Sequence, residues 1–362
     1  MKTLAIFSPN EITYSETFIQ AHKKLPYNIR YYYGGMLPVK AEFNPNLIDF
    51  SLRERIEKKI TQHGFNLREY ALMNSLKKEK VDCVLAEYGP TACATLKVVS
   101  FLKIPLVVHF HGYDASHKAT IKTYKDQYRQ VFEYASTIVA VSRKMKGDLI
   151  GLGCNEKKII VSSCGPDIIF FKNNPEYKNQ SFLTVGRFAE KKSPFTTILA
   201  FKKVTEKYPV AKLIMLGEGE LYSSSKVLVR ALKIEKNVEF KGVQTKESIK
   251  NLFEASIAFL QHSVVAESGD SEGTPVAVLE AQAAALPVVG TYHAGIPDIV
   301  INNETGLLVE ENDIDAMATN MMRILNEPGL ARRLGEKGRE RILNNFTQEI
   351  HLKSLKNIID KA

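Results

Sequence analysis

Short apolar runs alternate with longer stretches of helical periodicity along the first half of the chain. The runs are rich in β-branched and aromatic residues, which favour strands. They lie at residues 4–7, 29–33, 83–86, 106–110, 137–141 and 159–161, and the helical stretches lie at 15–25, 51–62, 92–101, 118–134 and 143–150. Because strands and helices take turns, this half is predicted to form a parallel α/β sheet.

The same alternation restarts in the second half. A polar segment with Asn and Pro, KNNPEYKNQ at 172–180, precedes it and predicts an interdomain linker. Strands are then predicted at 182–185, 213–216, 238–240, 257–260, 287–289 and 306–309, again alternating with helices.

We therefore interpret the 362 residues as two doubly wound, Rossmann-like domains, 1–170 and 171–345. Residues 346–362 are predicted to form a C-terminal helix that packs back on the first domain. Two such domains facing each other would leave a deep cleft at the carboxyl ends of their strands, where these sheets bind ligands.

The positive charge of the chain is concentrated in its first half. Residues 1–170 contain 24 Lys and Arg against 16 Asp and Glu, whereas residues 171–362 contain 25 against 24. A basic first half favours contact with an anionic surface such as a membrane. The alternative is that lysine-rich helices, such as 51–60 and 76–80, are only solvated faces. No aromatic-interleaved nucleic-acid motif is present, so no nucleic-acid partner is predicted.

The cysteines and the N-terminus indicate a cytoplasmic protein, with peripheral association at the inner membrane face as an option. Cys83, Cys93, Cys154 and Cys164 contain no C-x-x-C pair and are predicted to be reduced thiols. The opening MKTLAIFSPNE reads as a first strand, with too short an apolar run for a signal peptide. No segment reaches the roughly 20 apolar residues of a membrane span.

Residues 262–310 contain a candidate ligand-binding helix start. Pro275 is tolerated in a first helical turn, and the alanine-rich run that follows predicts a helix from about 275 through 285. Its free backbone N–H groups would favour an anion such as a diphosphate. The backbone predicted to bind there comprises Gly273, Thr274, Pro275 and Val276.

Two carboxylates flank this helix start. Glu272 precedes it and Glu280 lies about a turn and a half inside it, so both can reach one side. The alternative is a pair of surface glutamates, because this spacing arises easily by chance.

A basic pair and a glycine follow two predicted strands of the second half. Arg187 comes just after the strand at 182–185 and Lys192 five residues later. Together they could neutralise a departing diphosphate. Gly217 follows the strand at 213–216 and is predicted to contact the bound donor, although GEG lacks the third glycine of a dinucleotide-binding motif.

The segment HFHGYD follows the strand at 106–110. His111 before a glycine could hydrogen-bond a sugar hydroxyl, with Asp114 beside it. His109 and His111 could together bind a metal, but no third ligand is spaced nearby, so the sequence predicts no metal site.

Several ordered motifs resemble the retaining glycosyltransferases of family 4, which have the two-domain GT-B fold. In the second half they are VGRFAEKK, GEGEL and EGTPVAVLEAQAAALPVVGTYHAGIPDIV followed by NNETGLLV. In the first half, SPNEITYSETFI and FHGYD are similar to segments of exopolysaccharide enzymes of the colanic-acid type. The phrase SGDSEGTPVAVLEA is especially similar to that subgroup.

The resemblance implies separate roles for the candidate residues. Glu272 matches the glutamate that contacts donor-sugar hydroxyls, and Glu280 the one that binds the ribose. Arg187 and Lys192 match the pair that holds the diphosphate. His111 matches the histidine next to the reacting carbon of the donor sugar.

The resemblance further implies a metal-independent transferase without a cofactor. Such an enzyme moves a hexose from a nucleotide-diphosphate sugar, here a UDP-sugar in preference to a GDP-sugar, to a glycan or lipid-linked acceptor during surface polysaccharide assembly. Two alternatives remain open at this point. They are a GT-B epimerase of nucleotide sugars and a non-catalytic protein that binds nucleotides or glycans.

Overall fold

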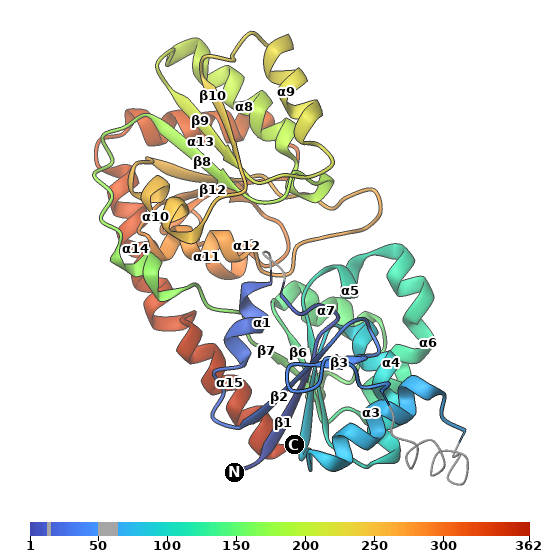
Figure 1. Ribbon diagram of the computed structural model, residues 1–362. Coiled ribbons are helices and arrows are strands. Elements are labelled where there is room, and N and C mark those ends of the chain that lie inside the picture. Colours follow the sequence, from blue (N-terminus) through green and yellow to red (C-terminus); the bar gives the residue numbers. More distant parts are fainter. Residues whose placement is uncertain (13–15, 50–63) are drawn as a thin grey trace. The chain divides into compact units, whose positions relative to one another are not determined.

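The computed structural model describes residues 1–12, 16–49 and 64–362, which form two compact units (Figure 1). Unit 1 comprises Met1–Ser163 and His351–Ala362, and unit 2 comprises Cys164–Ile350. The predicted helix at 51–62 and the first residue of the one at 15–25 lie outside the described residues. No helix in the described ranges combines the length and apolar character that a membrane span needs.

The change from unit 1 to unit 2 comes earlier than the predicted boundary at residue 170. The segment 172–180, predicted to be a linker, instead packs on unit 2. Asn173 Nδ2 donates to the Lys250 carbonyl, and the Tyr177 hydroxyl donates to the Ala285 carbonyl, each at 2.6 Å. These side-chain contacts fix a stretch whose polar composition alone suggested a free connection. At the other end of the chain, the return to unit 1 falls at His351 and not at 346.

Unit 1 is built on a seven-stranded sheet in the order β3-β2-β1-β4-β5-β6-β7. All neighbouring strands are parallel except β3, which pairs antiparallel with β2. The strands are β1 Thr3–Phe7, β2 Asn28–Tyr33, β3 Lys40–Ala41, β4 Cys83–Glu87, β5 Leu106–Phe110, β6 Thr137–Ala140 and β7 Ile159–Val161. The helices are α1 Thr17–His22, α3 Leu67–Lys78, α4 Gly89–Phe101, α5 Tyr113–Ser116, α6 Lys118–Tyr134, α7 Arg143–Gly151 and α15 Gln348–Lys361.

Both faces of this sheet are covered, which explains its continuous apolar strands. On one face, side chains of β1, β2, β4 and β5 pack with Ile19 of α1 and with Leu355 and Ile359 of α15. The last helix is therefore part of the core of unit 1. This agrees with the predicted return of the C-terminus.

Unit 2 has a six-stranded, all-parallel sheet in the order β10-β9-β8-β11-β12-β13. The strands are β8 Ser181–Val185, β9 Lys212–Leu216, β10 Val238–Gly242, β11 Ala258–Gln261, β12 Val288–Thr291 and β13 Gly306–Val309. The helices are α8 Pro194–Lys207, α9 Tyr222–Ala231, α10 Lys246–Glu254, α11 Val276–Ala283, α12 Ile296–Ile299, α13 Ile314–Asn326 and α14 Leu330–Asn345.

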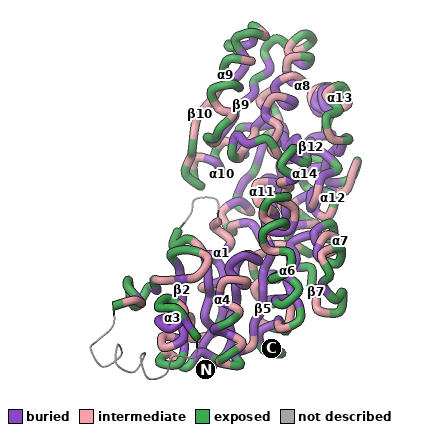
Figure 2. The backbone as a smooth tube through the Cα atoms, turned by 90° about the vertical axis from the view of Figure 1, so that its right-hand side faces the viewer, coloured by how far each residue is buried: buried purple, intermediate pink, exposed green. Residues whose placement is uncertain are grey.

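Successive residues of the unit 2 strands enter different cores because side chains alternate across a strand. Phe182 packs with side chains of α8, α9 and α13, whereas Leu183 packs with those of α10, α11 and α14. Helices thus cover both faces of the unit 2 sheet. In both units the strands are buried, and exposed residues lie on helices such as α6 of unit 1 and α9 of unit 2 (Figure 2).

The strands lie where the apolar pattern predicts them, with ends that differ by no more than two residues. Two elements of unit 1 differ. The two-residue strand β3 is too short to leave a pattern. The helix expected at 76–80 is the end of the longer α3, which stops before Lys80, a residue with φ of 51°.

Gly335 of α14 packs closely against the backbone just after α11. A Cβ atom at Gly335 would lie 1.9 Å from the Ala285 carbonyl oxygen, whereas one at Gly147 in α7 would meet nothing within 4 Å. We predict that Gly335→Ala lowers the free energy of unfolding by about 1–3 kcal/mol or more through overpacking. Gly147→Ala, the matched control, should raise it by about 0.5–1 kcal/mol. Chemical denaturation of both variants tests this, and an unchanged midpoint for Gly335→Ala would contradict the packing described.

Candidate functional site

The candidate residues of unit 2 follow the carboxyl ends of its parallel strands. Arg187 comes two residues after β8 and Gly217 directly after β9, and Glu272 lies in the loop between β11 and α11. Lys192 ends a short 3-10 turn, Glu190–Lys192, just before α8. Since parallel strands share one carboxyl edge, these loops are neighbours at that edge.

Backbone and side-chain contacts pin the Glu272 loop to the turn that carries Lys192. The Val264 N–H donates to the Lys191 carbonyl at 2.9 Å, and Lys191 Nζ lies 3.1 Å from Asp270 Oδ1. The Glu267 N–H donates to Glu190 Oε1 at 2.6 Å. The loop position is therefore set by unit 2 itself.

Lys192 and Glu272 form an ion pair in this position. Lys192 Nζ lies 3.0 Å from Glu272 Oε1, with side-chain exposures of 18 % and 9 %. The contact lacks the alignment of a hydrogen bond, so Oε1 has ion-pair attraction without hydrogen-bond satisfaction. Burial would raise the pKa of Glu272, but the charges of Lys192 and Lys191 outweigh it and hold the pKa below its ordinary value. The pair thus presents a charged ammonium group and a carboxylate, both of which could bind a polar ligand.

His293 and Glu311 hold the backbone of Glu272, and the sequence offered no prediction for either. His293 is 1 % exposed, and its Nδ1 lies 2.6 Å from Glu311 Oε1. Its Nε2 accepts the Glu272 N–H at 3.2 Å and lies 3.0 Å from Ser271 Oγ. Because Nε2 accepts a backbone N–H, the ring proton belongs on Nδ1, facing the carboxylate. His293 is a positioning residue for the loop.

The N-terminus of α11 begins directly after this loop. Helix α11 runs Val276–Ala283 with Pro275 as N-cap and no side-chain cap, slightly shorter than the predicted 275–285. In the described part of the chain, no hydrogen bond uses the N–H groups of Val276 and Ala277. The loop is braced where Gly295 N–H donates to the Gly273 carbonyl at 3.0 Å. Uncapped N–H groups and the helix dipole favour an anion here.

Glu280 lies inside α11 and differs from Glu272 in its ionisation. Desolvation raises its pKa to about 8, with Lys246 opposing and Asp167 adding to the rise. Lys246 and Asp167 themselves pair at 2.7 Å. Glu280 is therefore largely a neutral acid at pH 7, able to donate a hydrogen bond as well as to accept one.

Arg187 and Gly217 complete the unit 2 candidates. Arg187 is exposed, and no ion pair or side-chain hydrogen bond of its guanidinium is found among the described residues. Gly217 has φ of 117°, and a Cβ there would lie 2.0 Å from the Gly186 carbonyl oxygen. The close approach of these two loops therefore requires glycine at 217. The structure shows this packing reason, whereas contact with a donor stays a prediction.

Unit 1 places His111, in the loop after β5, next to Asp114 in the first turn of α5. Asp114 is fully buried, and its carboxylate accepts the N–H groups of Gly89, His111 and Gly112, each at 3.0 Å. Burial raises its pKa despite these bonds. Asp114 therefore shapes the loop that carries His111, and any effect on the donor would act through that loop. Gly112, with φ of 149°, supplies a conformation that other residues rarely adopt.

The imidazole of His111 is held by a buried glutamate at the end of β4. His111 Nε2 lies 2.7 Å from Glu87 Oε2, and the two side chains are 6 % and 0 % exposed. Burial would raise the pKa of Glu87, but His22, His109 and His111 around it hold the pKa well below its ordinary value. As a carboxylate it can only accept, so His111 donates from Nε2. Phe18 and Tyr88 pack against the ring, with centroids 4.5 and 4.8 Å away.

The sequence-predicted residues thus form two groups, one in each unit. Unit 2 brings Lys192 and Glu272 into contact beside the start of α11, and unit 1 joins His111 to Asp114. No three His, Cys, Asp or Glu side chains that could share a metal ion lie wholly within the described part of unit 2. Glu87 and His293 were missed because each acts through a partner distant in sequence.

Two family models match the chain one after the other. The model described as "Glycosyltransferase Family 4" matches residues 43–169, and "Glycosyl transferases group 1" matches residues 166–341. Together they cover most of both units.

Two curated relatives are similar over most of the chain. The colanic acid biosynthesis glycosyltransferase WcaL of Escherichia coli (strain K12) is 28% identical over 322 residues, which cover 84% of this chain and 79% of WcaL. The amylovoran biosynthesis glycosyltransferase AmsK of Erwinia amylovora is 28% identical over 76% of this chain and 68% of AmsK.

Solved structures share the fold at low sequence identity. Anabaena HepE in complex with UDP and glucose superposes with a TM-score of 0.81 at 14% identity, covering 100% of both chains. Sucrose-phosphate synthase from Thermosynechococcus elongatus has a TM-score of 0.79 at 19% identity, covering 100% of this chain and 99% of that one. With the motifs and the two Rossmann-like units, these matches identify the chain as a member of the family 4 glycosyltransferases of GT-B fold, resembling the exopolysaccharide type.

Proposed function

We propose that this glycosyltransferase is a retaining hexosyltransferase of surface polysaccharide assembly. It would take its sugar from a nucleotide-diphosphate donor, a UDP-sugar in preference to a GDP-sugar, and pass it to a glycan or lipid-linked acceptor. The observation that carries the proposal is the partly buried Lys192–Glu272 pair beside the uncapped start of α11. The relatives named for colanic acid and amylovoran biosynthesis support the polysaccharide class.

The charges of the site suit a nucleoside diphosphate leaving group. Lys192, Arg187 and the N–H groups of Val276 and Ala277 present positive charge, which would stabilise the negative charge that builds on the departing diphosphate. A diphosphate near Lys192 would replace Glu272 as its partner and release that carboxylate for the hydroxyls of the sugar. The neutral acid Glu280 can hydrogen-bond the ribose at lower desolvation cost than a carboxylate.

No side chain of the protein is proposed as a nucleophile in the transfer step. The oxygen of the acceptor hydroxyl forms a bond to the reacting sugar carbon as the bond from that carbon to the diphosphate breaks. The acceptor proton passes to the leaving phosphate. His111, donating from Nε2 to Glu87, would contact the donor sugar as the family resemblance implies. Neither Glu272 nor Glu280 is needed as an acid or base, and no metal or cofactor is proposed for this step.

Removal of either member of the ion pair should abolish turnover while the fold persists. We expect Lys192→Ala and Glu272→Gln each to lower kcat/KM at least about 100-fold, the scale for one preorganised charge partner of a transition state. The assay incubates the chain with UDP-, GDP- and ADP-sugars and an extract of lipid-linked glycans, and measures released nucleotide.

Lys202→Ala is the control, because Lys202 lies in α8 and pairs with Glu206 of the same helix, away from Glu272. It should keep activity within about tenfold of the wild type. Full activity in Lys192→Ala or Glu272→Gln would overturn the proposed site. Isomerised donor without acceptor would indicate an epimerase, and binding without release of nucleotide would indicate a non-catalytic protein.

The raised pKa of Glu280 makes stability depend on pH in a stated direction. Between about 4.5 and about 8, folded Glu280 holds a proton that the unfolded chain has lost. The free energy of unfolding therefore falls as pH rises through this window, by at most about 1.4 kcal/mol per pH unit from this group. Glu280→Gln removes that fall, so the variant should gain stability relative to wild type from pH 5 to pH 8.

Denaturant unfolding at several pH values measures this difference. Glu247→Gln removes an exposed glutamate of α10 and serves as the control. A pH-independent difference between Glu280→Gln and wild type would contradict a proton bound at Glu280.

The excess positive charge of the first half supports a proposal of contact with anionic lipid. Lys77, Lys78 and Lys80 are exposed near the end of α3. Their reversal to Glu should weaken binding to phosphatidylglycerol vesicles at low salt, because attraction near a charged surface is about 1 kcal/mol per residue. Reversal of Lys207, Lys233 and Lys236, exposed residues of unit 2, should have little effect. Equal binding by the two triple variants in vesicle sedimentation would remove the membrane proposal.

A further inference from the structure

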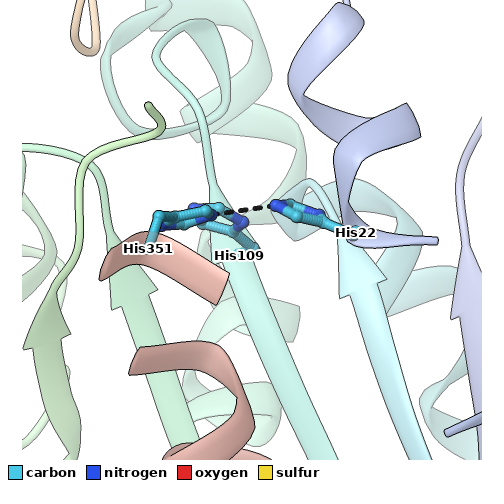
Figure 3. Close-up of side chains that lie close together, drawn as sticks. All are labelled: His22, His109 and His351. Atoms are coloured by element: carbon cyan, nitrogen blue, oxygen red, sulfur yellow. Dashed lines mark hydrogen bonds between the residues drawn. The ribbon is translucent and has the colours of Figure 1, made fainter. Parts of the chain in front are cut away.

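Three histidines from distant parts of the sequence meet inside unit 1 (Figure 3). His22 ends α1, His109 lies in β5 and His351 is in the first turns of α15. Their side chains are buried, and one ring nitrogen from each lies within 4.8 Å of the other two. The sequence showed no third ligand near His109, because His22 and His351 reach it only through the fold.

The Nε2 atoms of His22 and His351 face each other, and the Nδ1 atom of each ring contacts another side chain. Their Nε2 atoms are 2.9 Å apart and share a hydrogen bond, the dashed line in Figure 3, which a metal between the rings would replace. His22 Nδ1 lies 2.6 Å from Glu87 Oε1, and His351 Nδ1 lies 2.9 Å from Ser162 Oγ. A histidine whose outer nitrogen is fixed by a carboxylate or hydroxyl, and whose inner nitrogen points at other imidazoles, has the arrangement of a metal ligand.

His109 supplies the third and least satisfied imidazole. Neither of its ring nitrogens has a hydrogen-bond partner among the described residues, although both are buried. Its Nδ1 comes within 3.4 Å of Glu87 Oε2 without the alignment of a hydrogen bond. Leaving a buried polar atom unpaired is unfavourable, so a ligand bound at this imidazole would stabilise the folded chain.

The negative charge of the Glu87 carboxylate, next to the three histidines, also has no lysine or arginine partner among the described residues. Glu87 is fully buried, and its ion-pair partners are histidines. A divalent cation would balance the Glu87 carboxylate.

We propose that His22, His109 and His351 form a structural site for a divalent transition metal of the zinc class, with Glu87 as its charge partner. Three imidazoles suit this metal class. Zinc–nitrogen bonds of about 2.1 Å place tetrahedral ligands about 3.4 Å apart, so the rings need to move by about 1 Å. The metal would tie the last helix to the sheet and fix Glu87, which holds His111. This inference stands without the proposed transferase reaction.

The test uses the full chain without an affinity tag, freed of metal by a chelator and titrated with Co²⁺ as a spectroscopic probe. The expected result is one equivalent bound, with the visible absorption of four- or five-coordinate cobalt, displaced by one equivalent of Zn²⁺. His109→Ala and His351→Ala should each weaken binding at least tenfold, and Ser162→Ala about tenfold. His117→Asn, which keeps the cap of α6 outside the cluster, should bind like wild type.

Two outcomes would overturn the proposal. In the first, the wild-type protein binds less than one equivalent of Co²⁺. In the second, His109→Ala and His351→Ala bind Co²⁺ as tightly as the wild type does. In either case the cluster is a hydrogen-bond network around the Glu87 carboxylate. If a variant does not fold by circular dichroism, X-ray absorption of the wild-type zinc protein decides, because it must show three imidazole ligands.

Discussion

Parallel strand order is the constraint on which both candidate sites depend. All carboxyl ends of a parallel sheet lie at one edge, so loops that are far apart in sequence become neighbours. In unit 2 this brings the turn after β8, the start of the segment after β9 and the long loop after β11 together. In unit 1 it brings Glu87 at the end of β4 beside the loop after β5 that carries His111.

Two glutamates at these edges remain ionised although they are buried, because charged or hydrogen-bonding side chains stand next to them. Glu272 remains a carboxylate because two lysines outweigh its burial, and Glu87 because histidines do. Glu280, with a less favourable balance of charges, becomes largely neutral. Of three buried or partly buried glutamates, two are thus carboxylates and one is largely neutral, for local reasons. The two carboxylates suit a lysine or a histidine, and the neutral acid suits a ligand hydroxyl.

The sequence predicted the strands of both units well because fully buried parallel strands leave continuous apolar runs. It also singled out Lys192 and Glu272, whose loops the structure joins. It could not show Glu87, His293 or the meeting of His22 with His351, since those contacts connect residues from different elements and leave no periodic signal. The polar segment at 172–180 was misjudged for a related reason. Its composition resembles a linker, yet Asn173 and Tyr177 are fixed by hydrogen bonds to unit 2.

The direct test of the central claim is a crystal structure of the full chain with UDP-glucose. The account predicts that the diphosphate lies within hydrogen-bond distance of Lys192 Nζ, the Arg187 guanidinium and the N–H groups of Val276 and Ala277. It also predicts a sugar hydroxyl on Glu272 and the ribose on Glu280. A nucleotide bound elsewhere, with the Lys192–Glu272 pair unchanged, would contradict it.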